Sequence, residues 1–282
     1  MASEKGGASV DHPKYERLRA ILAEYGEAAV AFSGGTDSAL LLAAAHAELG
    51  SRAVAVTARS CIFPASEQQE AAGFCRARGI RQLFLDIGFP DPDAFRRNPP
   101  DRCYYCKLAL FRKIRSLAAE NGFSVIADGT NCDDTCDYRP GLRAAAELGI
   151  RSPLREAGLH KAEIRAISRE LGLPGWNKPA AACLASRIAY GEPVTAEKVG
   201  MADAAEAFLH GLGYSQVRVR MTDRAARIEL LPADIPSAVM RRTQIAERLR
   251  ELGFSYISLD LEGYRTGSMN ETIAERDKTL II

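Results

Sequence analysis

Two cysteines stand three positions apart in the segment Asp101–Lys107, as Cys103 and Cys106. A pair at this spacing can act as a redox dithiol or supply two of the four ligands that a zinc site requires. The sequence has no second pair at this spacing, and its histidines form no metal-ligand spacing (His12, His46, His160 and His210). The pair is therefore a redox dithiol, part of a site completed elsewhere in the chain, or two ordinary packed cysteines.

A glycine pair lies in the segment Ser33-Gly34-Gly35-Thr36-Asp37-Ser38, directly after an apolar run. Glycines at such a position let the backbone turn tightly, and a helix that begins there offers N–H groups and partial positive charge to phosphate oxygens. The hydroxyls of Ser33 and Ser38 can donate to the same anion, and Asp37 is placed to hold a Mg²⁺ ion. No Gly-Lys-Ser/Thr sequence follows, so the Walker type of phosphate loop is excluded.

Alternating strands and helices must position these residues. Short apolar runs at 28–33, 53–58, 82–87 and 124–130 predict buried strands, and the segments 36–50, 66–80 and 104–122 have helical periodicity. Pro13 marks the start of a leading helix. This alternation predicts an α/β fold with a parallel sheet sandwiched by helices.

A stretch rich in Pro, Gly and small residues at 171–193 separates this alternation from a different pattern in the rest of the chain. We expect a helix at 195–213, paired strands at 216–221 and 226–231, a helix at 235–253 and a strand at 256–261. The predicted domains are therefore an α/β domain at 1–175 and a smaller C-terminal α+β domain at 190–282, for substrate binding or oligomerisation.

Composition narrows the class of protein. The 282 residues include 37 Lys plus Arg against 36 Asp plus Glu, a net charge of +1, which argues against a nucleic-acid-binding surface. The sequence begins without an apolar leader and has no run of about 18 apolar residues, so we expect a cytoplasmic protein with no membrane contact. Seven cysteines in such a chain indicate reduced thiols, metal ligands or catalytic groups.

The segment 31–38 resembles the PP-loop of the ATP pyrophosphatases, which cleave ATP between its α and β phosphates and place AMP on a substrate oxygen. The strand ends Thr57-Ala58-Arg59 and 127–131 resemble two further nucleotide-contacting segments, and in a parallel sheet such ends meet at one edge. The resemblance implies that these residues bind ATP: Ala31, Phe32, Ser33, Gly34, Gly35, Thr36, Asp37, Ser38, Thr57, Asp128, Gly129 and Thr130.

Four segments follow one another in the order found in the LarE family: the cysteine pair, the segment 153–174, the sequence Ala182–Arg187 and the strand 217–220. The chain resembles these sulfur transferases, which build the nickel-pincer nucleotide cofactor of lactate racemase, from about residue 15 to about residue 265. The resemblance implies that a carboxylate of pyridinium-3,5-dicarboxylate mononucleotide is adenylated with ATP and then converted to a thiocarboxylate.

The phosphate of that substrate requires cations. Arg218 and Arg220 alternate along one strand, so their side chains share a face and can form a clamp. The pattern alone favours an edge strand with a solvated basic face, and only the resemblance implies the clamp. It also implies Arg187 as a third cation, with Glu206 and Asp234 beside the pocket.

In one form of the family three cysteines are placed like Cys103, Cys106 and Cys183, and the resemblance implies that they hold a [4Fe–4S] cluster with one open iron. In another form the cysteine matching Cys183 gives up its own sulfur and becomes dehydroalanine. The looser pair Cys132 and Cys136 is a rival, although neighbouring aspartates disfavour its thiolates. Cys61 and Cys75 are expected to be packed or half-exposed bystanders.

Two other functions stay open: a tRNA thiolase with an iron–sulfur cluster, and a nucleotide- and cluster-binding sensor that does no chemistry. We expect a small-molecule nucleotide substrate, a homo-oligomer and a separate protein that supplies sulfur.

Overall fold

The computed structural model describes residues 12–90, 93–136, 140–178, 182–265 and 267–269. The chain divides into two compact units. The first unit comprises Met1–Arg59, Ala65–Ile87 and Lys107–Ala180, and the second comprises Ser60–Pro64, Gly88–Cys106 and Ala181–Ile282. The consecutive domains that the sequence suggests, 1–175 and 190–282, stay a prediction.

The first unit contains a parallel sheet with the strand order β3-β2-β1-β4. Its strands are β1 (Ala28–Ala31), β2 (Ala53–Arg59), β3 (Gln82–Asp86) and β4 (Ile126–Ala127). The predicted parallel sheet is confirmed. β1 and β4 are shorter than the apolar runs at 28–33 and 124–130, because the residues after Ala31 and Ala127 form loops at the carboxyl ends of these strands.

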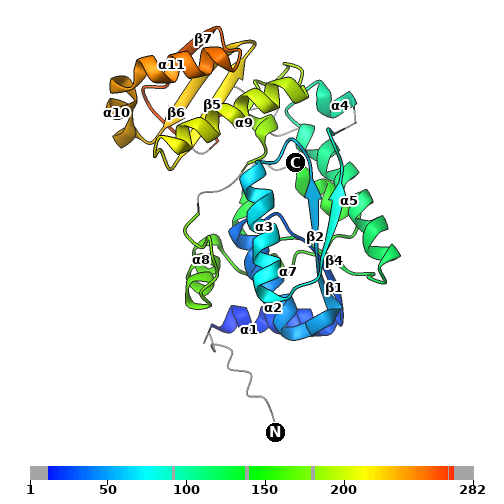
Figure 1. The fold of residues 1–282 in the computed structure, drawn as a ribbon. Helices are drawn as coiled ribbons and strands as arrows, with labels where there is room; N and C mark the ends of the chain where they lie inside the picture. The colour runs from blue at the N-terminus through cyan, green and yellow to red at the C-terminus, as the bar shows by residue number, and fades with distance from the viewer. Residues whose placement is uncertain (1–11, 91–92, 137–139, 179–181, 266, 270–282) are drawn as a thin grey trace. The chain divides into compact units, whose positions relative to one another are not determined.

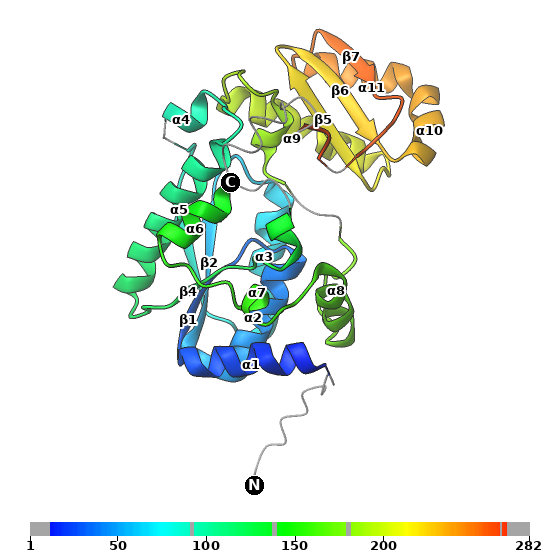
Figure 2. The same cartoon turned by 180° about the vertical axis from the view of Figure 1, so that it is seen from behind.

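Helices cover both faces of this sheet, as the opposite views of Figure 1 and Figure 2 show. Ala28 and Val30 pack in one core with the helices of the first face, whereas Ala29 packs in a second core with those of the other. This separation follows from the alternation of side chains along a strand. The first face carries α1 (Pro13–Tyr25), α2 (Thr36–Leu49), α3 (Ala65–Arg78), α7 (Pro153–Glu156) and α8 (Lys161–Glu170), and the other carries α5 (Arg102–Glu120) and α6 (Gly141–Glu147).

The second unit is built on a mixed sheet with the order β5-β6-β7. β5 (Val217–Thr222) pairs antiparallel with β6 (Ala225–Leu230), which pairs parallel with β7 (Tyr256–Leu259). Apolar residues of the three strands pack with α9 (Ala196–Gly211) and α11 (Arg242–Glu251) in a core of their own. The predicted α+β character of this part of the chain is confirmed.

The single helix predicted at 235–253 is wrong. Two helices are present, α10 (Ile235–Met240) and α11, and the backbone of Arg241 between them has φ −97° and ψ 14°. The Arg241 side chain is fixed by tertiary contacts: its Nη1 donates to the carbonyl of Leu212 at 2.8 Å, and its guanidinium lies 6.0 Å from the Tyr214 ring. Apolar periodicity continues through this position, so the break left no mark in the sequence pattern.

Several elements are short. They are α4 (Asp93–Arg96) and the 3-10 turns η1 (Gly50–Arg52), η2 (Asp133–Cys136), η3 (Leu184–Arg187) and η4 (Pro232–Asp234). Within the described ranges, no helix has both the length and the apolar character that crossing a membrane demands.

Candidate active site

The loop between β1 and α2 depends on its first glycine. Gly34 has a φ of 83°, a left-handed conformation that favours glycine, and a Cβ at this position would lie 3.2 Å from the Cβ of Ala71 in α3. Gly35 returns to extended backbone and directly precedes α2. The first N–H groups of a helix have no acceptor within the helix itself, and those of α2 lie at this loop.

Two serine hydroxyls converge at the same loop. Ser33 Oγ lies 3.1 Å from Ser38 Oγ, and it accepts a hydrogen bond from the backbone N–H of Gly35 at 3.3 Å. Ser38 Oγ also donates to the carbonyl of Gly35 at 3.0 Å. Thr36 differs, because its hydroxyl donates to the carbonyl of Gly175 at 2.8 Å and so anchors the loop.

The loop after β4 packs directly on the start of α2. A Cβ on Gly129 would lie 2.9 Å from the backbone nitrogen of Ser38 and 3.2 Å from its Cα. A distance below 3.0 Å is essentially never found for a real Cβ, so only glycine fits here without a shift. The two loops predicted to bind ATP, around Gly34 and Gly129, are therefore in contact.

Two of the predicted nucleotide ligands have structural hydrogen bonds. The Asp128 carboxylate accepts from the Thr130 hydroxyl at 2.7 Å and from the Ser152 hydroxyl at 2.9 Å. Thr57 Oγ1 donates to the carbonyl of Phe32 at 3.0 Å and accepts from Gln82 Nε2 at 2.8 Å. Both residues lie at strand ends as predicted, and their side chains hold neighbouring segments in place.

An ion pair at the loop was missed by sequence reasoning. Lys161 Nζ, at the start of α8, lies 2.7 Å from Oδ1 and 2.5 Å from Oδ2 of Asp37. Both side chains are partly exposed, at 31% and 24%. Asp133 fixes the start of α8, since its carboxylate accepts from the backbone N–H of Lys161 at 2.6 Å and pairs with the His160 ring at 2.7 Å. Both contacts lower the pKa of the Asp133 carboxyl, and the hydrogen bond with His160 has the larger effect.

The donor set of this loop fits a nucleotide phosphate with its metal ion. Helix N–H groups and two hydroxyls are the usual ligands of phosphate oxygens. The carboxylate of Asp37 is the kind of oxygen ligand that Mg²⁺ takes, and Lys161 is a cation beside it. A Mg²⁺ ion on Asp37 would replace the ammonium group of Lys161.

The three cysteines predicted to act together all belong to the second unit. Cys103 and Cys106 lie in the first turns of α5, Cys183 precedes η3, and each is half-buried. Cys106 and Cys183 pack against the same core. Burial raises the pKa of Tyr190, and the charges acting on its phenol include those of Cys103 and Cys183.

A buried asparagine joins the two cysteine-bearing segments. Asn98 is fully buried and left-handed, with a φ of 57°, and its Nδ2 donates to the carbonyl of Ile188 at 3.2 Å and to that of Ala189 at 2.7 Å. The turn before α5 is thus tied to the chain after Arg187. In the described part of the chain, no group of three or more His, Cys, Asp or Glu side chains is close enough to hold a metal ion. Three thiols are suitable ligands for an iron–sulfur cluster, but the described side chains are not close enough together to bind one.

The other cysteines differ in exposure. Cys75 is buried in the first unit, and burial raises the pKa of its thiol to about 11. Cys61 is exposed and so is not a packed cysteine. Cys132 lies 3.8 Å from the carbonyl of Arg155, also in the first unit. The side chain of Cys136 lies outside the described residues.

Arg187 forms a buried ion pair with Glu206. Its Nε and Nη2 donate to the two carboxylate oxygens of Glu206, each at 2.8 Å, and the two side chains are only 2% and 7% exposed. Its Nη1 donates to the carbonyls of Ala182 at 2.9 Å and Cys183 at 3.3 Å. Arg187 therefore holds the backbone of the segment that contains Cys183, and Glu206 holds Arg187.

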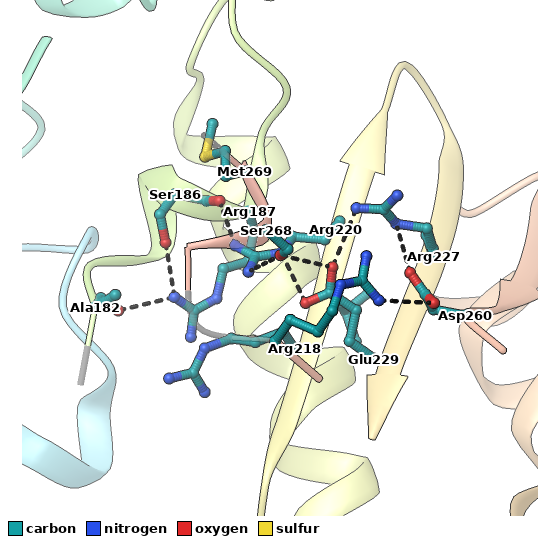
Figure 3. A network of polar contacts seen from close by, with 12 residues as sticks. Ala182, Ser186, Arg187, Arg218, Arg220, Arg227, Glu229, Asp260, Ser268 and Met269 are labelled. Carbon is teal, nitrogen blue, oxygen red and sulfur yellow. Dashed lines mark hydrogen bonds and ion pairs between the residues drawn. The ribbon is translucent and has the colours of Figure 1, made fainter. Parts of the chain in front are cut away.

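A second buried carboxylate organises the arginines of β5 and β6 (Figure 3). Glu229 is fully buried and lies 3.1 Å from both Arg220 Nε and Arg227 Nη2. Arg220 also donates to the carbonyl of Ser186 at 2.8 Å and to the hydroxyl of Ser268 at 3.2 Å. Arg227 was not predicted from the sequence, although it lies opposite Arg220 in the strand register.

These arginines lie at a cavity of about 270 Å³ within the second unit. Its walls include Arg187, Arg220, Arg227 and Tyr190, together with the serines Ser186, Ser258 and Ser268. Cations and hydroxyls around a cavity of this size suit a small anionic molecule. Among the predicted substrate residues, Arg187 and Arg220 line the cavity, whereas Arg218, Glu206 and Asp234 are not part of its wall.

Arg218 is buried, at 8% exposed, so a solvated basic face is wrong for this residue. Its Nη1 donates to the carbonyl of Val217 at 2.7 Å, and its guanidinium lies 5.5 Å from the Tyr264 ring. Burial, and next the positive charge of Arg187, lower the pKa of Arg218. The side chains of Arg187 and Arg218 gather beside Arg220 in Figure 3.

No family model matches the chain. The chain is 38% identical over 263 residues to the pyridinium-3,5-bisthiocarboxylic acid mononucleotide synthase of Lactiplantibacillus plantarum, which covers 93% of this chain and 95% of the relative. The chain belongs to the LarE family of sulfur transferases. Another similar protein, an uncharacterized protein of Synechocystis, is 41% identical over 264 residues, 93% of this chain and 98% of the relative.

A more distant likeness is partial. Over 111 residues the chain is 35% identical to the tRNA-5-methyluridine(54) 2-sulfurtransferase of Thermus thermophilus, which covers 37% of this chain and 34% of that protein. With the parallel sheet and the loop at 33–38, these relatives confirm the predicted PP-loop ATP pyrophosphatase fold of this LarE family member.

Proposed function

We propose that this chain is an ATP-dependent sulfur transferase that adenylates a carboxylate of pyridinium-3,5-dicarboxylate mononucleotide and converts it to a thiocarboxylate for nickel-pincer nucleotide synthesis. The observation that carries the proposal is the 38% identity to a synthase named for the bisthiocarboxylic acid product, over 95% of the length of that synthase. The loop at 33–38 and the arginine-lined cavity of the second unit support it, because the reaction needs a phosphate cradle and a site for an anionic nucleotide.

In the first step, a carboxylate oxygen of the substrate attacks the α-phosphorus of ATP, and the bond to the β-phosphate oxygen breaks. The departing pyrophosphate gains charge, which the N–H groups of α2 and the hydroxyls of Ser33 and Ser38 would stabilise. Asp37 would hold the Mg²⁺ ion, which supplies further positive charge. Lys161, released from Asp37, would turn its ammonium group to the pyrophosphate.

The arginines of the second unit would hold the phosphate of the substrate nucleotide. Arg220 and Arg227 reach the cavity with geometry fixed by Glu229, so their guanidinium groups need little reordering on binding. Arg218 and Arg187 add positive charge beside them. Glu206 acts through Arg187, and a role for Asp234 stays a prediction.

In the second step, a sulfur nucleophile attacks the carbonyl carbon of the acyl-adenylate, the bond from that carbon to the AMP oxygen breaks, and AMP leaves. We assign the sulfur to the site of Cys103, Cys106 and Cys183, with Cys183 held by Arg187. A [4Fe–4S] cluster on these thiolates, when bound, would supply the sulfur atom. The alternative is that Cys183 itself gives up its sulfur and becomes dehydroalanine.

Iron and sulfide analysis of anaerobically purified protein separates these two sources of sulfur. If three thiolates hold a cluster, the protein is brown, and replacing Cys103, Cys106 or Cys183 by Ala removes the colour and the iron. If Cys103→Ala and Cys106→Ala retain sulfur transfer, and Cys183 loses H₂S during one turnover, the cluster assignment is wrong.

The proposed adenylation is tested by pyrophosphate release with ATP and the dicarboxylate nucleotide. We expect release that depends on the nucleotide, and its loss in Ser33→Ala and Asp37→Ala while circular dichroism stays unchanged. Full release in both folded variants would exclude the loop as the phosphate cradle. Release with tRNA in place of the nucleotide would favour the tRNA thiolase, and no release with either would favour a sensor.

A homo-oligomer, a sulfur-supplying protein partner and a cytoplasmic location are further parts of the proposal. Size measurement, pull-down and cell fractionation test these three parts in turn.

A further inference from the structure

Arg102 is an almost fully buried cation at the start of the cysteine site. It directly precedes Cys103, opens α5 and is 2% exposed. Its Nη1 donates to Asn98 Oδ1 at 2.6 Å, and its guanidinium lies 4.9 Å from the Tyr190 ring. Arginine keeps its charge inside proteins, so a buried guanidinium is expected to be matched by an anion.

One edge of this guanidinium lacks a strong acceptor. Across the described residues, the buried Nε–H of Arg102 has no hydrogen-bond partner. The Nη2 group donates to Met269 Sδ at 3.6 Å, and a thioether is a weak acceptor. Nε and Nη2 form the side of the planar fork that binds a carboxylate with two parallel hydrogen bonds. The Asn98 contact leaves this side available.

The residues around that edge belong to the cavity wall. Tyr190, which faces the guanidinium, and Met269, which contacts Nη2, both line the cavity that also contains Arg220. The phenol of Tyr190 is within electrostatic range of Cys103, Cys183 and Arg102. A small anion at the Nε–Nη2 edge would thus lie beside two residues of the cavity wall, on the residue that precedes Cys103, all within the second unit.

We propose that Arg102 binds a carboxylate of the pyridinium substrate through its Nε and Nη2 groups, displacing the sulfur of Met269. This assignment rests on the proposed function, and it divides recognition between two cations. Arg220 would bind the nucleotide phosphate, and Arg102 would select the carboxylate over an uncharged group. The carboxylate would then be held beside the thiols that deliver sulfur.

The test compares two nucleotides that differ only in this group: nicotinic acid mononucleotide, which has a carboxylate, and nicotinamide mononucleotide, which has a neutral amide. Calorimetry on the full chain gives both affinities. Wild type should prefer the acid, and Arg102→Gln should lose about ten- to hundredfold for the acid with little change for the amide. Arg102→Lys, which keeps the charge without the fork, should be intermediate. Arg220→Gln should weaken both nucleotides equally.

An equal loss for both nucleotides in Arg102→Gln would mean that Arg102 only supports the fold, and it would overturn the assignment. If Arg102→Gln fails to fold, Arg102→Lys decides: an unchanged preference for the acid also overturns it. If wild type binds both nucleotides with equal affinity, carboxylate selection is absent and the assignment is wrong. If wild type binds neither nucleotide, carboxylate binding at Arg102 is overturned, whereas the proposed function is decided separately by pyrophosphate release with the dicarboxylate nucleotide.

Discussion

Gly129→Ala should damage the phosphate site without touching any group that does chemistry. The added Cβ would lie 2.9 Å from the backbone nitrogen of Ser38, about half an ångström short of the 3.4 Å at which ordinary contacts begin. Both partners are backbone, so a flexible side chain cannot move aside. Either the loop after β4 or the start of α2 must shift.

Overpacking of this kind costs about 1–3 kcal/mol. If that cost falls on the conformation that binds phosphate, ATP affinity drops about five- to hundredfold. The matched control is Gly73→Ala in α3, where an added Cβ has no neighbour within 4 Å. This control should leave ATP binding unchanged and stabilise the helix by about 0.5–1 kcal/mol.

ATP titration calorimetry and thermal unfolding of both variants make the comparison. Gly129→Ala with wild-type ATP affinity would refute the reasoning, because the two loops would then move apart without consequence for the phosphate cradle. Equal weakening of ATP binding in both variants would refute it too, since the loss would not depend on the contact with Ser38.

Three further outcomes are expected. Lys161→Ala should slow pyrophosphate release at saturating ATP by about tenfold or more, because it removes the cation that the proposed mechanism turns from Asp37 to the leaving pyrophosphate; an unchanged rate would mean that the lysine has only a structural role. Glu206→Ala should lower the free energy of unfolding by about 3–5 kcal/mol in urea, since Arg187 stays buried without its carboxylate; a loss below about 1 kcal/mol contradicts this. Iodoacetamide should alkylate exposed Cys61 faster than Cys75, whose pKa burial raises to about 11; equal rates in peptide mass spectra would contradict that burial.

The fold was largely predictable because short apolar runs alternate with helical periodicity over the first part of the chain. The strand ends and the turn at Gly34 followed from local rules of backbone conformation. The break at Arg241 did not, since contacts with Leu212 and Tyr214 impose it and both are distant in sequence.

The candidate site was predictable where a motif is contiguous, as at 33–38. Lys161 and Arg227 were missed because each acquires its place from a partner far away, Asp37 in one case and Glu229 in the other. Glu206 was predicted beside the substrate pocket, but its ion pair with Arg187, a residue of the cavity wall, could not be predicted. A buried carboxylate and its partner can be recognised only after the fold brings the segments together.

Sulfur transfer itself is the central claim, and an anaerobic single-turnover incubation with ATP and pyridinium-3,5-dicarboxylate mononucleotide tests it most directly. Mass spectrometry would follow the nucleotide and the peptide that contains Cys183. We predict a thiocarboxylate nucleotide formed together with AMP and pyrophosphate, and a Cys183 that keeps its sulfur when the cluster is loaded. AMP and pyrophosphate released without any sulfur in the nucleotide would contradict the claim.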